Sequence, residues 1–371
     1  MDADPGCMSP HLFSLEAEML MRPVEVGMAH AHRPAHRIPT VAIVGPGLVG
    51  ATTAFALLVS GAAAEIVLIG RDSNRVAGQV KDLGDAALYS HATRIVAGDF
   101  ADCASADVII VTVGAPQRRE KYSRLDDLKS SAAMVKEVMT EIATQEPNGV
   151  IVIASNPVDV LTYAAWKWSG LSAGRVIGSG TLLDSSRFRR RLGERYGIAS
   201  ENVHAYVIGE HGDSQVPLLS TARIGGAPLS EFCQERYPSD CEETLRGIAK
   251  SARIGGEDIL RVKGATNYGI AAALTRIATA ILRDEHAVLT VSTVVPEAME
   301  LGQVSLSVPV IVGREGVERV LPLRLSDEED RALRLSAQTL KRHIATLDLA
   351  PVSSGPQDWR SLRPSWMHTT R

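Results

Sequence analysis

Short apolar runs alternate with helical patterns along the first half of the chain. Residues 40–44 and 65–69 are apolar runs, and residues 51–60 between them are small and apolar at helical spacing. Two further continuous apolar runs occupy residues 106–113 and 149–154. Such runs are typical of strands buried on both faces of a parallel sheet. The pattern therefore predicts an α/β fold built on a doubly wound parallel sheet.

A glycine-rich turn joins the first predicted strand to the first predicted helix. Its glycines at 45, 47 and 50 have the G-x-G-x-x-G spacing. The first makes the turn, the second lets a diphosphate approach the backbone, and the third lets helix pack on strand. The amides that open the helix then bind the diphosphate. We therefore expect a Rossmann-type domain whose coenzyme contacts include Gly45, Gly47, Leu48, Val49 and Gly50.

The end of the second predicted strand departs from the usual NAD-binding pattern. An NAD site places Asp or Glu there, on the ribose hydroxyls. This chain has Gly70 followed by Arg71. Loss of the carboxylate removes repulsion against a 2′-phosphate, and Arg71 could pair with that phosphate, so the pair predicts acceptance of NADP(H). Alternatively, Asp72 takes the ribose role and NAD(H) remains the coenzyme.

Composition narrows the possible partners. The 371 residues carry 39 Lys and Arg against 43 Asp and Glu, a net charge of −4, which gives no electrostatic case for nucleic acid or an anionic membrane. No apolar run approaches the length of a membrane span. The four cysteines have no CxxC spacing and no metal-ligand pattern. We expect reduced thiols in a cytoplasmic protein without a metal.

The segment at residues 209–214 holds a histidine between glycines. His211 can give and take a proton near neutral pH, and a carboxylate such as Asp184 can fix its tautomer. Three residues after Asp184 stands Arg187, whose guanidinium can grip a carboxylate through two parallel hydrogen bonds. Together these residues predict acid–base chemistry on an anionic substrate. By themselves, residues 209–214 also fit a polar surface turn.

The motifs occur in an order that resembles the L-lactate/L-malate dehydrogenase family. The resemblance covers about residues 38–347 and implies a nicotinamide-dependent oxidoreductase that acts on a 2-hydroxy acid. NAD(H) is the coenzyme that the family implies. The matching motifs are Gly45/Gly47/Gly50, Gly114-Ala115, Arg124-Leu125-Asp126, Ser155-Asn156-Pro157, Leu183 to Arg189, Gly209 to Asp213 and Lys263 to Thr266.

The resemblance implies a role for each catalytic residue. His211 would be the acid–base and Asp184 its orienting partner. Arg187 would anchor the substrate carboxylate. Arg124 would polarise the ketone and stabilise the negative charge that develops on its oxygen. Asp184 could alternatively be a helix cap, because Ser185 also suits a helix start.

Other family positions fall around the expected cleft. Gly114, Ala115 and Asn156 follow two of the predicted strands and match residues that contact the coenzyme, and Asn156 also matches a substrate contact. The family pattern implies a cis bond before Pro157, although an Asn-Pro turn is the alternative for Asn156. Thr266 matches a residue that lines the substrate pocket.

The loop before Arg124 would discriminate between substrates. Gln117 stands where lactate-type members have Gln and malate-type members have Arg, so we expect pyruvate and L-lactate as substrates. Compared with the common family pattern, the loop is one residue longer and lacks a central glycine. Counted backward from Arg124, Arg118 falls in the discriminating place, which leaves malate or another 2-hydroxy acid as the alternative. A dinucleotide-binding sensor without catalysis is a remoter alternative.

The resemblance also implies assembly and regulation. Arg189 and His204 match positions where bacterial members bind fructose 1,6-bisphosphate between subunits, and two cations suit a phosphate. A surface arginine and a loop histidine are the alternative. A homotetramer would follow from family membership.

The chain divides into four segments. A small apolar stretch predicts a helix near 267–283 that joins the coenzyme domain, and Ser326 with the acidic residues after it predicts the start of an amphipathic helix. The rest of the second half would form an α+β substrate domain. The expected segments are a loosely ordered N-terminal extension at 1–37, a dinucleotide-binding domain at 38–178, the substrate domain at 179–347 and a tail at 348–371.

Overall fold

The computed structural model describes residues 38–114, 124–237 and 239–350, without the side chains of residues 124–127. The predicted N-terminal extension and most of the predicted tail therefore lie outside the described residues. Residues 348–350 are described. Here the Asp348 carboxylate accepts a hydrogen bond from Lys136 Nζ at 2.7 Å, and its carbonyl accepts one from Trp168 Nε1 at 3.1 Å.

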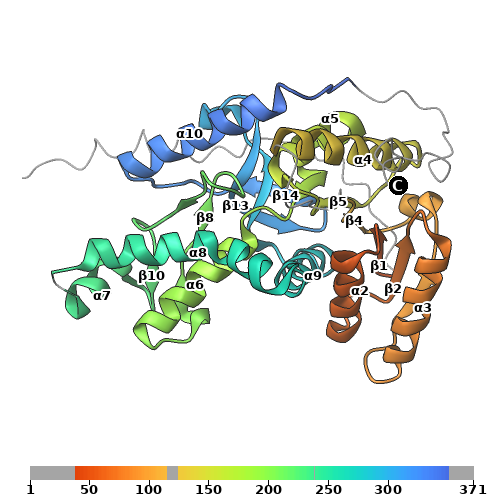
Figure 1. Cartoon of the computed structure of the whole chain (residues 1–371), viewed down its shortest axis with the longest axis horizontal. Coiled ribbons are helices and arrows are strands. Elements are labelled where there is room, and N and C mark those ends of the chain that lie inside the picture. The colour runs from red at the N-terminus through yellow and green to blue at the C-terminus, as the bar shows by residue number, and fades with distance from the viewer. Residues whose placement is uncertain (1–37, 115–123, 238, 351–371) are drawn as a thin grey trace, which may run out of the picture. The chain divides into compact units, whose positions relative to one another are not determined.

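A nine-stranded sheet runs through the described chain (Figure 1). Its first six strands are parallel, in the order β3-β2-β1-β4-β5-β6. This is the strand order of the dinucleotide-binding fold, in which a ligand lies beyond the carboxyl ends of the strands where the order reverses, here between β1 and β4. These six strands are Thr40–Val44, Glu65–Ile69, Arg94–Ala97, Val108–Val111, Val150–Ile153 and Val176–Gly178.

Three antiparallel strands from the second half extend the same sheet. They continue it beyond β6 in the order β12-β13-β14, and the junction is the pairing of Ser292 with Gly178. These strands are β12 (Ala287–Val294), β13 (Ser305–Gly313) and β14 (Gly316–Val320). Two small antiparallel sheets use β7 (Val203–His204), β10 (Arg223–Ile224) and β11 (Ala227–Pro228), and β8 (Val207–Ile208) with β9 (Val216–Pro217).

Helices cover both faces of the large sheet (Figure 1). The helices α2 (Leu48–Ser60), α3 (Ser73–Ala87) and α9 (Tyr268–Leu282) lie on one face, and α4 (Arg124–Thr144), α5 (Val158–Ser169) and α10 (Asp327–Ile344) on the other. The remaining helices are α6 (Leu182–Tyr196), α7 (Leu229–Arg236) and α8 (Cys241–Lys263), with short 3₁₀ turns η1 (Phe100–Ala104), η2 (Ala173–Arg175), η3 (Ser200–Asn202) and η4 (Glu297–Met299).

Apolar burial explains why the sequence forms this sheet. Strands β1, β4 and β5 are buried at every position, as the continuous apolar runs predict. Each fully buried Val or Ile side chain contributes about 1.5–3 kcal/mol. The doubly wound parallel sheet is confirmed. The strands predicted at 106–113 and 149–154 are shorter in the structure, because their ends already belong to the turns that carry the site.

The predicted start of the last helix is also confirmed. Ser326 is the N-cap of α10, and its hydroxyl accepts a hydrogen bond from the Glu329 amide at 3.3 Å. The Glu329 carboxylate in turn accepts from the Ser326 amide at 2.9 Å, which completes a capping box. This helix packs beside α5, and its Ser336 hydroxyl accepts a hydrogen bond from the backbone amide of Glu210, next to His211.

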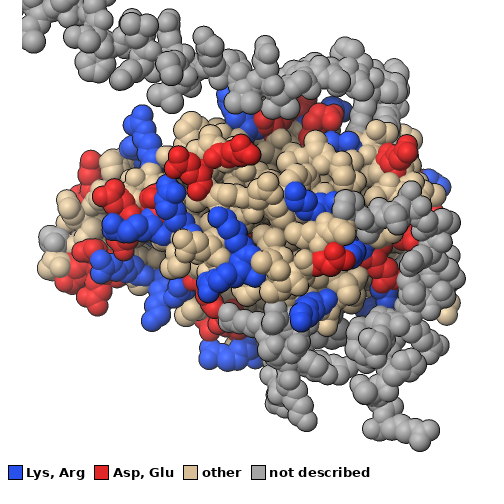
Figure 2. All heavy atoms as spheres, turned by 90° about the horizontal axis from the view of Figure 1, so that it is seen from above, with Lys and Arg blue, Asp and Glu red and all other residues tan. Residues whose placement is uncertain are grey.

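Two surface properties follow from the described residues. None of their helices combines the length and the apolar character that crossing a membrane requires. Figure 2 looks onto the face that carries α4, α5 and α10, and there basic and acidic side chains are interspersed.

Candidate active site

The loop that carries His211 is fixed by contacts at its first two residues. Gly209 pairs with Ser307 of β13 through two backbone hydrogen bonds, at 2.8 and 2.9 Å. Its φ of +82° suits glycine, and a Cβ there would lie 2.8 Å from Ser336 Oγ. The next amide, that of Glu210, donates to the same Ser336 oxygen at 2.8 Å. The sheet and α10 therefore hold the start of the loop, and His211 follows directly.

The structure brings together His211, Asp184 and Arg187. His211 Nδ1 lies 2.5 Å from Asp184 Oδ2, and Arg187 Nη1 donates to Asp184 Oδ1 at 2.9 Å. The Asp184 side chain is only 3% exposed, whereas that of His211 is 29% exposed, so the ring remains reachable from outside. Asp184 lies in the first turn of α6, after an N-cap at Thr181, so its interpretation as a helix cap is wrong.

Charges around the imidazole raise its affinity for a proton. Burial works to lower the pKa of His211, but the Asp184 and Asp159 carboxylates outweigh burial and hold that pKa above its usual value. Burial works to raise the pKa of Asp184, but the charges of His211 and Arg187 hold it below its usual value. The pair is therefore arranged to hold an imidazolium beside a carboxylate.

A second buried carboxylate, which sequence reasoning missed, supports the histidine backbone. Asp159 on α5 accepts a hydrogen bond from the His211 amide at 2.6 Å and is 1% exposed. Burial raises the pKa of Asp159 to about 6. A lone carboxylate among the apolar residues that begin α5 is the signal in the sequence.

The strand-end loops place Asn156 beside the cleft. Asn156 follows β5, and the Asn156–Pro157 peptide is cis, as the resemblance implies. Ser155 before it donates a hydrogen bond to the Val113 carbonyl, which ties this loop to the end of β4. Asn156 is exposed, and Thr266 is half-buried between α8 and α9.

The glycine turn fits a coenzyme diphosphate. A Cβ on Gly50 would lie 2.5 Å from the Gly45 carbonyl oxygen, so helix α2 approaches the turn as only glycine permits. A Cβ on Gly47 would meet no described atom closer than 4.0 Å. The N-cap of α2 is Gly47, which has no side chain to cap the helix, and this leaves the amides of Leu48 and Val49 to a diphosphate. Gly114 likewise has no described atom within 4 Å of the Cβ position.

At the expected ribose end, both charged residues after Gly70 already have partners. Asp72 is the N-cap of α3, and its carboxylate accepts from the Arg75 amide at 3.0 Å. Arg71 Nη2 donates to Glu137 Oε2 of α4 at 2.9 Å. Sequence reasoning missed Glu137, because nothing local links residues 66 positions apart.

Most of the expected substrate-loop residues lie outside the part of the chain that the structure describes. Gln117 and Ala115 lie outside the described residues, and so does the side chain of Arg124, whose backbone begins α4.

The two residues expected to bind the activator, Arg189 and His204, are near each other. Arg189 donates to the carbonyls of Val203 at 2.7 Å and Ser200 at 3.3 Å, and His204 follows Val203 on the surface.

Two family models match almost the whole described chain. The model of the lactate/malate dehydrogenase NAD binding domain matches residues 39–178, and that of the lactate/malate dehydrogenase alpha/beta C-terminal domain matches residues 181–348. The chain belongs to the lactate/malate dehydrogenase family.

Relatives named L-lactate dehydrogenase match the chain over most of its length. The enzyme of Acetivibrio thermocellus is 42% identical over 314 residues, which are 84% of this chain and 98% of that protein. The enzyme of Moorella thermoacetica is 44% identical over 310 residues, or 83% and 98% of the two chains. The family resemblance of the sequence is confirmed.

Solved lactate dehydrogenases share the fold. A lactate dehydrogenase from a Medee basin deep-sea metagenome library has a TM-score of 0.80 and 36% identity, and it covers 84% of this chain and 99% of its own. The minor L-lactate dehydrogenase from Enterococcus mundtii, in a ligands-bound form, has a TM-score of 0.80 and 35% identity over the same shares. The NAD-binding domain with a C-terminal α/β domain is thus common to all three.

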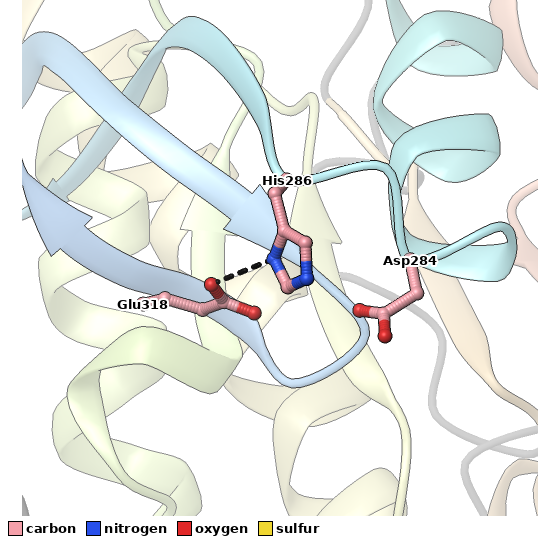
Figure 3. A group of neighbouring side chains, drawn as sticks. All are labelled: Asp284, His286 and Glu318. Carbon is pink, nitrogen blue, oxygen red and sulfur yellow. Dashed lines mark hydrogen bonds and ion pairs between the residues drawn. The ribbon is translucent and has the colours of Figure 1, made fainter.

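Elsewhere in this dehydrogenase fold, the described residues include one group that could hold a metal ion (Figure 3). Asp284 and His286 follow α9, and Glu318 lies on the edge strand β14. His286 Nδ1 bonds the Glu318 carboxylate at 2.9 Å, and Asp284 accepts from the Arg314 amide at 2.7 Å. These polar partners explain the arrangement without an ion.

Proposed function

We propose that the protein is an L-lactate dehydrogenase, which interconverts pyruvate and L-lactate. The observation that carries this proposal is the buried Asp184 carboxylate, which contacts both His211 and Arg187. Asp184 thereby holds two groups side by side: His211, which can carry a proton, and Arg187, whose guanidinium can bind a substrate carboxylate. The names of the relatives support the same activity.

Arg187 binds the carboxylate of the 2-oxo acid. One of its nitrogens is committed to Asp184, which aims the guanidinium, and its other donors remain for the substrate. The neighbouring helix α8 presents Gly255 and Gly256 toward the Arg187 side chain: a Cβ on Gly255 would lie 3.6 Å from Cδ, and one on Gly256 3.4 Å from Nη1. Two glycines in the middle of a helix cost about 1 kcal/mol each relative to alanine, and here they leave the side of Arg187 that faces α8 without a side chain at these two positions.

His211 moves the proton. Its Nδ1 is held by Asp184, so Nε2 is the nitrogen available to the substrate. In pyruvate reduction Nε2 gives its proton to the ketone oxygen, and in L-lactate oxidation it takes the hydroxyl proton. The nicotinamide coenzyme supplies or accepts the hydride when bound. Arg124 polarises the ketone in this scheme.

The substrate preference rests on Gln117. A neutral amide accommodates the methyl group of pyruvate, whereas an arginine would pair with a second carboxylate. Initial rates with pyruvate and oxaloacetate test this assignment. A kcat/KM for pyruvate well above that for oxaloacetate is expected. The reverse order would give the discriminating role to Arg118 and make the protein a malate dehydrogenase.

The coenzyme is NAD(H), with tolerance for NADP(H). Gly70 supports this tolerance because no carboxylate there repels a 2′-phosphate, and Arg71 can pair with that phosphate once it leaves Glu137. Steady-state kinetics with both reduced coenzymes test it. A kcat/KM for NADPH lower than that for NADH by about a hundredfold, or about 2.7 kcal/mol, would contradict it.

Assembly into a homotetramer is supported by an apolar stripe on α2. Leu48, Phe55 and Val59 share one face of the helix and are 53%, 49% and 52% exposed. Arg189 and His204 would bind fructose 1,6-bisphosphate between subunits. Light scattering with and without this compound tests both statements, and a monomer under both conditions would contradict them.

Free thiols at Cys103, Cys233 and Cys241 support a cytoplasmic location, which cell fractionation tests.

A further inference from the structure

The end of β2 excludes the carboxylate that usually recognises the NAD ribose. A Cβ on Gly70 would lie 2.9 Å from Val76 Cγ2 and 3.0 Å from Pro46 Cδ. Pro46 belongs to the glycine turn and Val76 to α3, so both neighbours are themselves fixed. An aspartate at position 70 would have to displace them. Asp72 is committed to capping α3 and has its carboxylate on the Arg75 amide.

Glu137, on helix α4, brings a carboxylate to the side chain of Arg71, the residue after Gly70. Its Oε2 accepts from Arg71 Nη2 at 2.9 Å, and the two side chains are 21% and 31% exposed. A pair with this burial is screened less by solvent than one on the open surface. The contact joins the residue after Gly70 to the middle of α4, the helix that follows the substrate loop.

The second oxygen of Glu137 is an unused acceptor. Glu137 Oε1 is buried and has no hydrogen-bond partner among the residues that the structure describes. A buried acceptor of this kind calls for a donor. A ribose hydroxyl can donate a hydrogen bond, whereas the 2′-phosphate of NADP(H) brings only acceptors and negative charge.

We propose that Glu137 determines the coenzyme preference, by restraining Arg71 and by accepting a hydrogen bond from the adenosine ribose of NAD(H). The inference rests on the proposed function only in requiring that a nicotinamide dinucleotide binds along the glycine turn. A 2′-phosphate must separate Arg71 from Glu137 and then lie beside the freed carboxylate. Tolerance for NADP(H) through Arg71 is therefore limited by Glu137.

Direct binding of NADH and NADPH to the purified full-length protein tests this proposal without turnover. Kd values from coenzyme fluorescence or calorimetry are compared for the wild type, Glu137→Gln, Glu137→Asp and Asp85→Asn. Asp85→Asn removes one exposed carboxylate from α3 and serves as the charge-matched control. We expect the wild type to bind NADH more tightly. In Glu137→Gln the ratio of the NADPH Kd to the NADH Kd should fall by about tenfold, mainly because NADPH binds more tightly.

The other variants separate the charge from its placement. Glu137→Asp keeps the charge and should keep NADH as the preferred coenzyme, and Asp85→Asn should leave both Kd values within about twofold. In Arg71→Gln/Glu137→Gln the gain in NADPH affinity should disappear, because no cation remains to meet the phosphate. Thermal melting of each variant confirms that it folds.

An unchanged Kd ratio in Glu137→Gln, or an equal loss for both coenzymes, would overturn the role of Glu137. Failure of the wild type to bind either coenzyme would overturn this inference and the proposed function together. Coenzyme binding with the expected ratios but without pyruvate turnover would overturn the proposed function alone.

Discussion

Replacing Asp184 with asparagine should slow pyruvate reduction while leaving the fold in place. The amide has nearly the same shape as the carboxylate, but it removes the charge that faces both His211 and Arg187 at 2.5 and 2.9 Å. A hydrogen bond to a charged group is worth about 1.5–3 kcal/mol. At 1.36 kcal/mol per factor of ten, kcat/KM for pyruvate should fall by about 10- to 150-fold.

The pH dependence of the loss identifies its cause. Reduction needs a protonated His211, so its rate falls as the pH rises through the pKa of that histidine. The Asp184 carboxylate raises this pKa, and Asp184→Asn should therefore shift the falling limb to lower pH. L-lactate oxidation needs the neutral ring, so its rising limb should shift in the same direction.

The assay follows NADH absorbance at a series of pH values near neutrality, with saturating coenzyme. Glu194→Gln serves as the control, because Glu194 is an exposed carboxylate of the same helix that pairs with Arg190. The control should stay within about twofold of the wild type. A loss in Asp184→Asn that is equal at every pH, or an unmoved limb, would refute the role of Asp184 in raising the pKa of His211.

Three further perturbations test other parts of the structure. Gly50→Ala places a Cβ 2.5 Å from the Gly45 carbonyl oxygen, so NADH binding by calorimetry should weaken by about tenfold or more, and unchanged affinity would contradict the packing of the turn. Asp159→Asn should move the falling limb of pyruvate reduction to lower pH, because the charged carboxylate raises the pKa of His211, and a wild-type pH–rate profile would contradict this. Ser326→Ala removes a helix cap and should lower the free energy of unfolding in urea by about 1 kcal/mol; no change would show that the capping box does not contribute.

Much of the sheet could be predicted from the sequence, because its strands are locally encoded. The apolar runs at residues 40–44 and 65–69 coincide with β1 and β2. Strand β3 has no such run: it includes Arg94, and its first and last residues are exposed. The antiparallel extension could not be predicted either, since the pairing of Ser292 with Gly178 joins segments far apart in the sequence.

Part of the candidate site could likewise be predicted from the sequence, and part could not. His211, Asp184 and Arg187 were expected together because each stands in a motif whose chemistry needs the others. The role of Asp159 was missed because its partner is the backbone amide of His211, which every residue but proline has; only the position of Asp159 among apolar residues marks it. The contact of Arg71 with Glu137 depends on how α4 lies against the end of β2, and this follows from the fold alone.

The central claim is that His211 carries the proton for a pyruvate/L-lactate dehydrogenase. It is tested most directly by NADH formation from L-lactate and NAD⁺, with the wild type and His211→Asn side by side and NADH affinity measured for both. The account predicts turnover by the wild type and a loss of about 10²–10⁴-fold in the variant, with NADH affinity little changed. A variant that keeps most of the activity would contradict the role of His211. A wild type that binds NADH but turns over neither L-lactate nor pyruvate would contradict the proposed activity.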